Sequence, residues 1–368
     1  MLFHLGAIWR LAELGFLGSG AHTAVMRDGT RRAVGTLQRI SSVSGGSITS
    51  ALLALKWAKL DVNQPGLADR FVEHVVTPIR GLSEVPIAGT DRKGRWSVLF
   101  DIFRQGSIND HVIAAYKEHL YGNATLQDLP DIPRFVINAS NLQSGALWRF
   151  SKPYMWDWRV GKIENPTLSL AQAVAASSAF PPFLAPAPLS FNDTDYIEKS
   201  GGQGKNNLQR PPFTTRPVLA DGGVYDNLGL ETAYKRYLTL LVSNAGKPFE
   251  MTETVHSDWA RLGNRCISVM DNQVLSLRKR LLLANFKSEI RTGCLWDIDQ
   301  NITIHGAQNA LNFPYSVSQN LAQIGTDMST KDKSTQEQLI NWGYANCDAA
   351  IRGHVDPALP VPTRLPYP

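Results

Sequence analysis

The chain has 368 residues, of which 43% are hydrophobic and 19% are charged. This composition allows a sizeable core and excludes a disordered chain. The formal net charge of +5 suits an anionic surface, but no block of lysine and arginine and no zinc-ligand spacing predicts nucleic-acid binding. The cysteines Cys266, Cys294 and Cys347 are scattered and odd in number, which predicts free thiols in a reducing compartment.

The chain contains no apolar run long enough to span a membrane. Its apolar start, MLFHLGAIWRLAELG, lacks a basic segment before it and is interrupted by Arg10 and Glu13, so a signal peptide is not expected. We therefore expect a cytoplasmic protein, and no residue pattern in the sequence predicts a cofactor or metal site. Peripheral contact with a membrane surface is compatible with its charge.

In chain order, the first predicted element is a helix over residues 2–14, with apolar residues at helical spacing and no capping residue. Residues 61–129 are predicted to be mainly helical, and the segment RKGR at 92–95 is interpreted as a solvated loop. In residues 134–160, Gly145 divides two β-rich runs, which predicts a hairpin. A helix of small residues follows in LSLAQAVAASSAFPP, and a polar surface loop covers residues 191–216.

In the C-terminal part, we predict a short buried strand ending at Asp221, another strand over 265–270, and a basic helix over 275–290. That helix sets Arg278, Lys279 and Arg280 beside a leucine face, and a solvated surface helix is favoured over a membrane-docking one. A proline-rich tail, residues 356–368, is expected to be extended and loosely held. The domain prediction is one α/β domain over 1–355 followed by this tail.

Residues 37–55, LQRISSVSGGSITSALLAL, pass from a β-type run into a helical pattern with no room for a loop. Ser44 lies at the turn, and the positions two before and two after it, Ser42 and Gly46, are small. This arrangement is typical of a nucleophile elbow, which lifts a serine hydroxyl above the end of a sheet. The N–H of Gly45 begins the helix and can donate to a developing oxyanion. A plain glycine-rich turn fits the pentad equally well.

A second candidate group stands late in the chain, in PVLADGGVYDNLGLE. Asp221 is predicted at the carboxyl end of a strand, where α/β folds place their sites. Gly222 and Gly223 follow it and would let two backbones approach closely. If Ser44 and Asp221 converge above one sheet, an ionised carboxylate within hydrogen-bond reach can take the serine proton.

Four stretches together resemble the patatin-like phospholipases, namely HLGAIWRL, SVSGGS, AVAASSAFPP and ADGGVYDNLGLE. The resemblance implies a three-layer α/β/α fold with a mostly parallel central sheet. It also implies metal-free hydrolysis of phospholipid or other acyl-ester lipids through an acyl-enzyme. By the same resemblance, Ser44 is the nucleophile of a Ser-Asp dyad, Asp221 is the base, and Gly222 and Gly223 complete the D-G-G signature.

Members of that family carry oxyanion donors on a glycine-rich loop, G-G-G-x-R/K-G, just upstream of the H-L-G helix. The sequence given begins three residues before His4 and contains no such loop. We therefore expect a strand and a glycine loop to precede Met1, so that the fold as given lacks its first strand. Two alternatives stay open. One is a catalytically impaired lipid- or membrane-binding module, and the other is an α/β-hydrolase with a Ser-Asp-His triad completed by His256, His305 or His354.

Overall fold

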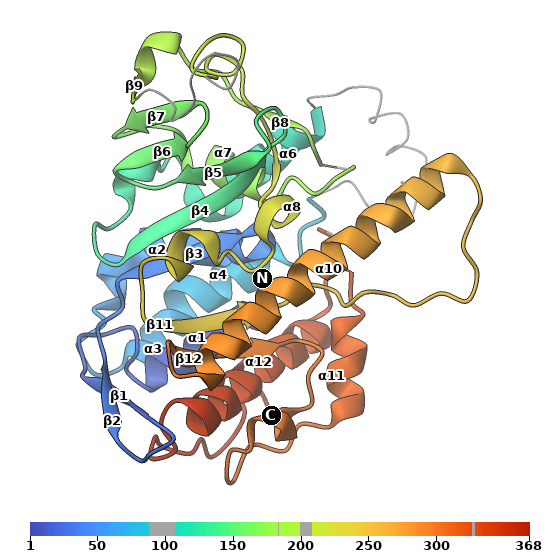
Figure 1. Cartoon of the computed structure of the whole chain (residues 1–368). Coiled ribbons are helices and arrows are strands. Elements are labelled where there is room, and N and C mark those ends of the chain that lie inside the picture. Colours follow the sequence, from blue (N-terminus) through green and yellow to red (C-terminus); the bar gives the residue numbers. More distant parts are fainter. Residues whose placement is uncertain (88–106, 183, 199–207, 326–327) are drawn as a thin grey trace.

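The computed structural model describes residues 1–87, 107–182, 184–198, 208–325 and 328–368. Its largest sheet has eight strands, and Figure 1 shows it in the upper half of the molecule. Along the sheet the order is β8 (Ala187–Pro188), β10 (Val218–Asp221), β4 (Arg134–Asn141), β5 (Ala146–Phe150), β6 (Tyr154–Asp157), β7 (Gly161–Glu164) and β9 (Tyr196–Glu198). The eighth strand, β3 (Arg39–Val43), also pairs with β4.

The expectation of a mostly parallel central sheet is wrong for this sheet. Only the β3–β4 pair is parallel. The pairs β4–β5, β4–β10, β8–β10, β5–β6, β6–β7 and β7–β9 are all antiparallel. The reason lies in the connections. Tight turns join β4 through β7, and a tight turn can only join antiparallel strands, whereas helices separate β3 from β4 and permit the parallel pair. The fold remains of the α/β class.

A second sheet joins β11 (Thr239–Asn244) and β12 (Thr292–Asp297) in parallel, and the long helix α10 (Trp259–Lys287) connects these two strands. A separate hairpin pairs β1 (His22–Val25) with β2 (Arg31–Val34). Within the described ranges, β3 pairs only with β4 and β11 only with β12. Each of these two strands therefore keeps one unpaired edge.

The other helices are α1 (Leu2–Glu13), α2 (Ser44–Leu60), α3 (Leu67–Phe71), α4 (Thr77–Leu82), α6 (Ser107–Tyr116), α7 (Leu170–Ser177), α8 (Gly223–Asp226), α9 (Glu231–Tyr234), α11 (Tyr315–Ala322) and α12 (Lys333–His354). Helices α2 and α7 pack against β4, and α1 lies along α12. The α1–α12 contact requires glycine, because a Cβ added at Gly6 would lie 1.8 Å from the Ile340 carbonyl oxygen. The core is continuous from α1 and α12 to the sheet.

Several predictions from the sequence are confirmed. The opening helix forms as α1, the strand–helix passage forms as β3 and α2, and Gly145 turns between β4 and β5 with φ of 67°. The strand expected over 265–270 is wrong, because this stretch is inside α10, whose first turn is capped by the Asp258 side chain. The RKGR segment lies outside the described residues.

The C-terminal tail is not loosely held, contrary to the expectation. Asn341 exchanges two hydrogen bonds with the backbone of Tyr367, at 2.9 and 3.0 Å, and the Tyr367 ring lies edge-on to Trp9. The guanidinium of Arg80 stacks over the same ring. The backbone and ring of Tyr367 thus anchor the tail to the body of the protein.

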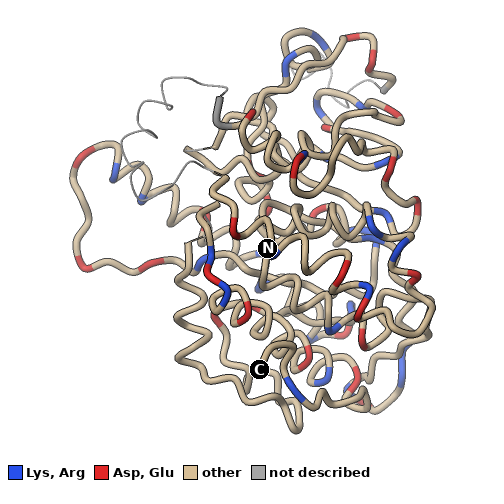
Figure 2. The backbone as a smooth tube through the Cα atoms, turned by 180° about the vertical axis from the view of Figure 1, so that it is seen from behind, with Lys and Arg blue, Asp and Glu red and all other residues tan. Residues whose placement is uncertain are grey.

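No helix in the described part of the chain is long and apolar enough to cross a membrane. Figure 2 shows basic and acidic residues interspersed along the backbone.

Candidate active site

Ser44 stands at a sharp strand-to-helix turn. Strand β3 ends at Val43, which is extended, and α2 begins at the next residue. Ser44 itself has φ of 51°, in the left-handed region that residues other than glycine rarely occupy. Such strain is found where the surrounding structure holds a side chain in a required direction. A sharp strand-to-helix turn at Ser44 is what the sequence predicted.

Strand β4 brings Ser44 and Asp221 together. Two strands pair along the same edge of β4. Strand β3 pairs along Arg134–Asn138, with Val43 opposite Asn138. Strand β10 pairs along the rest of that edge, with Asp221 opposite Ala139. The carboxyl ends of β3 and β10 therefore meet at adjacent positions of one strand. The residues that follow, Ser44 and Gly222, lie at this junction.

Gly222 is required at the junction because the backbones nearly touch. A Cβ added there would lie 2.3 Å from the Asn138 carbonyl oxygen and 2.9 Å from Cγ1 of Val43. The Gly222 N–H donates to the Ser177 carbonyl oxygen at 3.1 Å. Any larger residue would separate β10 from β4 and move Asp221 away from Ser44.

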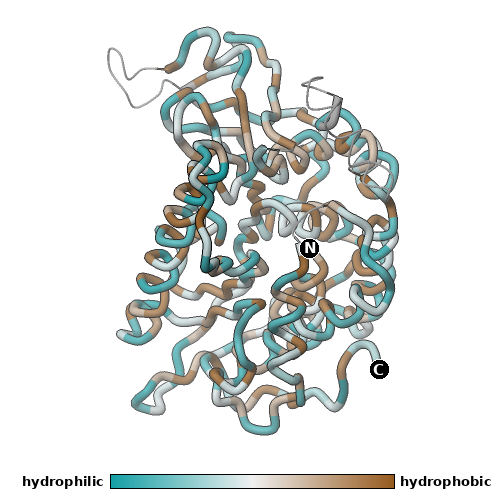
Figure 3. The backbone as a smooth tube through the Cα atoms, turned by 90° about the vertical axis from the view of Figure 1, so that its right-hand side faces the viewer, coloured by the Kyte–Doolittle hydropathy of each residue, from teal (hydrophilic) through white to brown (hydrophobic). Residues whose placement is uncertain are grey.

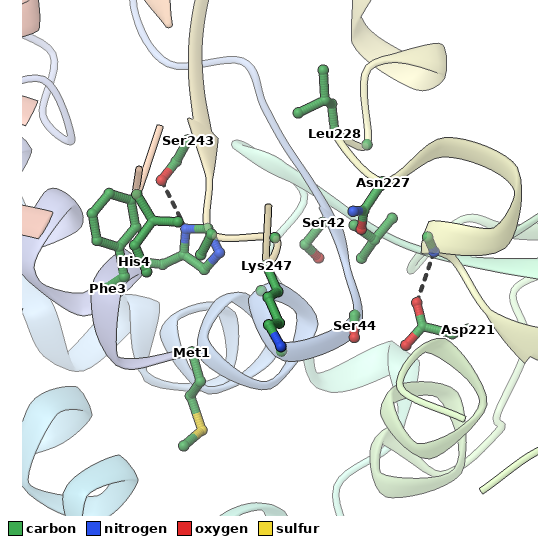
Figure 4. Close-up of a pocket in the computed structure, with 18 of the residues that line it drawn as sticks. Met1, Phe3, His4, Ser42, Ser44, Asp221, Asn227, Leu228, Ser243 and Lys247 are labelled. Carbon is green, nitrogen blue, oxygen red and sulfur yellow. Dashed lines mark hydrogen bonds between the residues drawn. The ribbon is translucent and has the colours of Figure 1, made fainter. Parts of the chain in front are cut away.

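The Asp221 carboxyl is 4% exposed and sits above the sheet end. Its Oδ1 accepts a hydrogen bond from the Gly223 N–H at 2.7 Å, while Oδ2 is buried without a hydrogen-bond partner and lies on the Ser44 side (Figure 4). Burial raises the pKa of Asp221 to about 6, although the Ser44 hydroxyl and the Gly223 amide act in the opposite direction. A carboxylate with a free oxygen and a pKa near neutrality is suited to proton transfer.

Buried hydroxyl groups hold the elbow in place. The Ser44 N–H donates to Oγ of Ser177 at 3.2 Å, and that hydroxyl donates to the Asn138 carbonyl oxygen at 2.7 Å. Ser47 contacts Ser177 Oγ at 2.8 Å, and its own hydroxyl also reaches Ser42. The sequence predicted the helix of small residues but did not single out Ser177 or Asn138.

The remaining residues singled out around the elbow serve packing and access. Ser42 is buried, and its Oγ accepts from Ser50 at 2.6 Å, so a hydroxyl is used where the usual motif has glycine. A Cβ added at Gly45 would lie 3.1 Å from the Met1 nitrogen, whereas one at Gly46 would make ordinary contact with His4. The Gly45 amide is among the first of α2, which have no acceptor within the helix.

The site opens into a cavity of about 2630 Å³. Ser44 and Asp221 are on its wall, and so are the unpaired edges of β3 and β11, because residues 37–43 and 239–243 line it without interruption. Side chains alternate along a strand, so an uninterrupted run means that the cavity meets the backbone edge. In Figure 4, Met1, His4 and Lys247 lie on the side of Ser44 away from Asp221.

His4 lies on the part of the cavity wall that is on the side of Ser44 away from Asp221. Its Nδ1 is 2.8 Å from the Ser243 hydroxyl, and burial lowers its pKa to about 3. The imidazole is therefore neutral at physiological pH and adds no positive charge near the elbow.

All eight histidines are in the described part of the chain, and none of them hydrogen-bonds to Ser44 or Asp221 there. His256 lines the cavity, but it is exposed and contacts Arg261 at 3.2 Å. His305 and His354 contact each other at 3.2 Å, away from the cavity. The residues proposed for a Ser-Asp-His triad are thus not brought together. The described residues also contain no group of three or more metal-binding side chains.

Comparison with known families agrees with this geometry. The model of the patatin-like phospholipase family matches residues 1–234, well over half of the chain, so the protein belongs to this family. A search of curated proteins found no match. Membership indicates hydrolysis of lipid acyl esters as the general activity of the chain. The matched region contains both Ser44 and Asp221.

Proposed function

We propose that the protein is a lipid acyl hydrolase of the phospholipase A or esterase type, with Ser44 as nucleophile and Asp221 as its base. The observation that carries this proposal is the junction on β4, where a strained serine lies beside a buried carboxylate with one unpartnered oxygen. A structural aspartate normally has both oxygens hydrogen-bonded. An unpaired one facing a serine hydroxyl is suited to receive its proton.

The first chemical step forms an acyl-enzyme. Oγ of Ser44 attacks the ester carbonyl carbon while Oδ2 of Asp221 takes the hydroxyl proton. The carbonyl oxygen becomes an oxyanion, and the Gly45 N–H at the start of α2 is placed to donate to it. When the C–O bond breaks, Asp221 returns the proton to the departing alcohol oxygen.

The second step releases the fatty acid. Water gives a proton to the same carboxylate and attacks the acyl carbon, and the Ser44 oxygen leaves with that proton. The sequence of steps uses the side chains of Ser44 and Asp221 and backbone amides, and requires no metal or cofactor. The cavity wall is predominantly apolar, which suits acyl chains presented by a membrane, micelle or other lipid aggregate.

A fluorophosphonate probe tests the proposal directly, because it reacts with serines that a base has activated. We expect one labelled site, located at Ser44 by peptide mass spectrometry, and loss of labelling in Asp221→Asn. A lipid panel on the same preparation then identifies the ester hydrolysed. Labelling at another serine, or equal labelling of the wild type and Asp221→Asn, would refute the assignment.

A second function is favoured by the unpaired edges of β3 and β11. Among the described residues at the elbow, we identify the Gly45 amide as an oxyanion donor, and a single donor suits a catalytically impaired module that binds lipid in the large cavity. In that case the protein would bind lipid vesicles but would not react with the probe. The two measurements together distinguish the enzyme from the binding module.

A further inference from the structure

The long helix α10 exposes an unusual amount of apolar side chain. Of its 29 residues, only Leu282 is fully buried. Trp259 is 87% exposed, Val269 50% and Leu277 51%. Figures 1 and 3 show α10 crossing one face of the molecule as its outer element. Exposed apolar surface of this extent marks an interaction site.

Helical geometry separates the side that packs on the protein from the side that faces away. At 100° per residue, Leu275, Leu282 and Phe286 lie on one side and pack against the β11–β12 sheet. The opposite side is the outward face, formed by Trp259, Leu262, Cys266, Val269, Leu277 and Leu281, all of which are exposed. An amphipathic helix normally places polar residues there.

The outward face is continuous with the catalytic cavity. Ile267, Met270 and Val274 form its rim: each is between 44% and 61% exposed, and each also lines the cavity that contains Ser44. An apolar path therefore leads from the outer surface of α10 over this rim toward the nucleophile.

The charges on α10 favour an anionic partner. Asp271 is its one acidic residue, and it lines the cavity and does not belong to the outward face. The exposed residues Arg280 and Lys287 extend beside the outward face. Just before the helix, Asp258 is paired with Arg261 at 3.2 Å.

The basic cluster anticipated from the sequence is not the relevant feature. Arg278 reaches Asp226 and Glu231, and Lys279 bonds to Asp297 at 2.9 Å, so both turn toward the protein. Of the three, only Arg280 is exposed. Reversing the charge of all three would break buried ion pairs and would not test contact with lipid.

We propose that the outward face of α10 lies on a phospholipid surface, with the helix axis in the membrane plane and the rim opening the cavity toward the lipid. Interfacial helices bury an apolar face at the boundary of headgroups and acyl chains, where tryptophan is enriched. This docking rests on the proposed function in one respect, since it delivers substrate to Ser44. The competing occupant is a second copy of the chain, because Ile267, Met270, Val274, Leu277 and Leu281 also recur at coiled-coil spacing.

Cys266 allows a direct test because it lies on the outward face, while Cys294 and Cys347 are buried. An environment-sensitive fluorophore attached to Cys266 in Ser44→Ala protein is mixed with phosphatidylcholine vesicles, with and without phosphatidylglycerol. We expect a blue shift with both, stronger binding to the anionic vesicles, and quenching by brominated acyl chains. An unchanged spectrum would overturn the proposal. Cys266→Ser protein controls for labelling elsewhere.

The paired variants are Val269→Asp/Leu277→Asp on the outward face and Ile304→Asp, which replaces a residue 64% exposed on another element. We expect the double variant to bind vesicles about 10-fold more weakly or worse, and the control to bind normally. Both should hydrolyse a water-soluble monomeric ester like the wild type. Loss of that hydrolysis in the wild type as well would indicate failure of the proposed function and not of docking. Equal vesicle binding by all three proteins would overturn the proposal. A wild-type dimer that becomes monomeric in the double variant but not in the control would overturn it as well.

Discussion

The two sides of Ser44 are built differently. On the side of α7 and β10, the backbone amides are paired: Ser44 N–H with Ser177 Oγ, Gly222 N–H with the Ser177 carbonyl, and Asp221 N–H with the Ala179 carbonyl. On the side of α1 and β11, the edge of β3 is unpaired and faces the cavity. The base side of the site is fixed by hydrogen bonds, whereas the oxyanion side is open.

In the proposed mechanism, the two requirements of acyl transfer are met on different sides of Ser44. Positioning of the base depends on β4, which sets the ends of β3 and β10 at adjacent residues. Stabilisation of the oxyanion depends on donors that converge from the other side, where Gly45 provides one amide. Changes on the two sides should therefore have separable effects, on the chemical step and on its electrostatic support.

The largest effect is expected on the closed side of the site, which is the side of α7 and β10 that hydrogen bonds fix. Ser44→Ala and Asp221→Asn should each lower kcat on a short-chain ester about 10,000-fold or more, because nucleophile and base act as one unit. Asparagine keeps the shape of the aspartate and its contact with Gly223, so Tm should change little. Steady-state kinetics and thermal unfolding measure the two quantities.

Alanine at His256, His305 or His354 is the matched comparison. Each variant should retain most of the activity, because none of these rings contacts Ser44 or Asp221. A histidine as essential as Ser44 would show that a triad operates and that the dyad assignment is wrong.

The next largest effect is expected on the open side. We predict that a strand and a glycine-rich loop preceding Met1 would pair with the free edges of β3 and β11 and bring further amides toward Ser44. A chain extended by the upstream coding sequence should show kcat about 100- to 1,000-fold higher for each donor gained. An unpaired inner edge also favours aggregation, so solubility should improve.

The control is an extension of equal length whose loop glycines are replaced by alanine. Such a segment can still supply the strand but cannot bring the backbone equally close to the substrate. Equal kcat with and without the native extension would contradict the prediction. Improved solubility without a change in kcat would assign the segment to folding alone.

Local sequence patterns were sufficient for the parts of the site that depend on a single turn. The small residues around Ser44 predicted the elbow, and the D-G-G run predicted an aspartate at a strand end. The partners that lock these turns could not be predicted, because the fold alone brings Ser177 to the Ser44 amide and Asn138 to the Ser177 hydroxyl. Nothing in an alanine- and serine-rich helix indicates which of its hydroxyl groups faces a distant strand.

The direction of strand pairing was harder to predict than the strands themselves. The motifs indicated an α/β protein, but the sheet follows the turns between β4 and β7, which impose antiparallel pairing. In the same way, Ile267 and Val269 favoured a strand by local propensity, yet the Asp258 cap and packing of Leu282 place them in α10. Tertiary context decided both cases.

A smaller effect should appear in the pH profile. Asp221 accepts a proton only when ionised, and burial raises its pKa to about 6. Below this pKa, kcat/KM should fall by about 10-fold per pH unit, and above it the profile should be flat. The measurement is kcat/KM for a water-soluble ester between about pH 5 and 8, which reports the titration of Asp221 in the free enzyme.

The matched comparison is Asp221→Asn, whose residual activity should not show this limb. An inflection near the ordinary pKa of an aspartate, about 3.9, would mean that the carboxyl is solvated in the free enzyme. It would then not occupy the buried position beside Ser44. A limb that persists in Asp221→Asn would assign the titration to another group.

The smallest effect is expected for Ser177→Ala, which loosens the closed side without touching the reacting groups. The substitution leaves the Ser44 N–H and the Asn138 carbonyl without their partner, and a buried unpaired polar group costs about 1–3 kcal/mol. We expect a lower free energy of unfolding by about that amount, and a severalfold decrease in kcat with KM unchanged, because the elbow samples other conformations. Ser178→Ala at the C-cap of the same helix is the control, since its hydroxyl bonds to the Val174 carbonyl and contacts the Tyr116 hydroxyl but not the Ser44 amide. If both variants lose kcat equally, general destabilisation of α7 explains the loss. If only Ser177→Ala loses it, the hydrogen bond to the Ser44 amide positions the nucleophile.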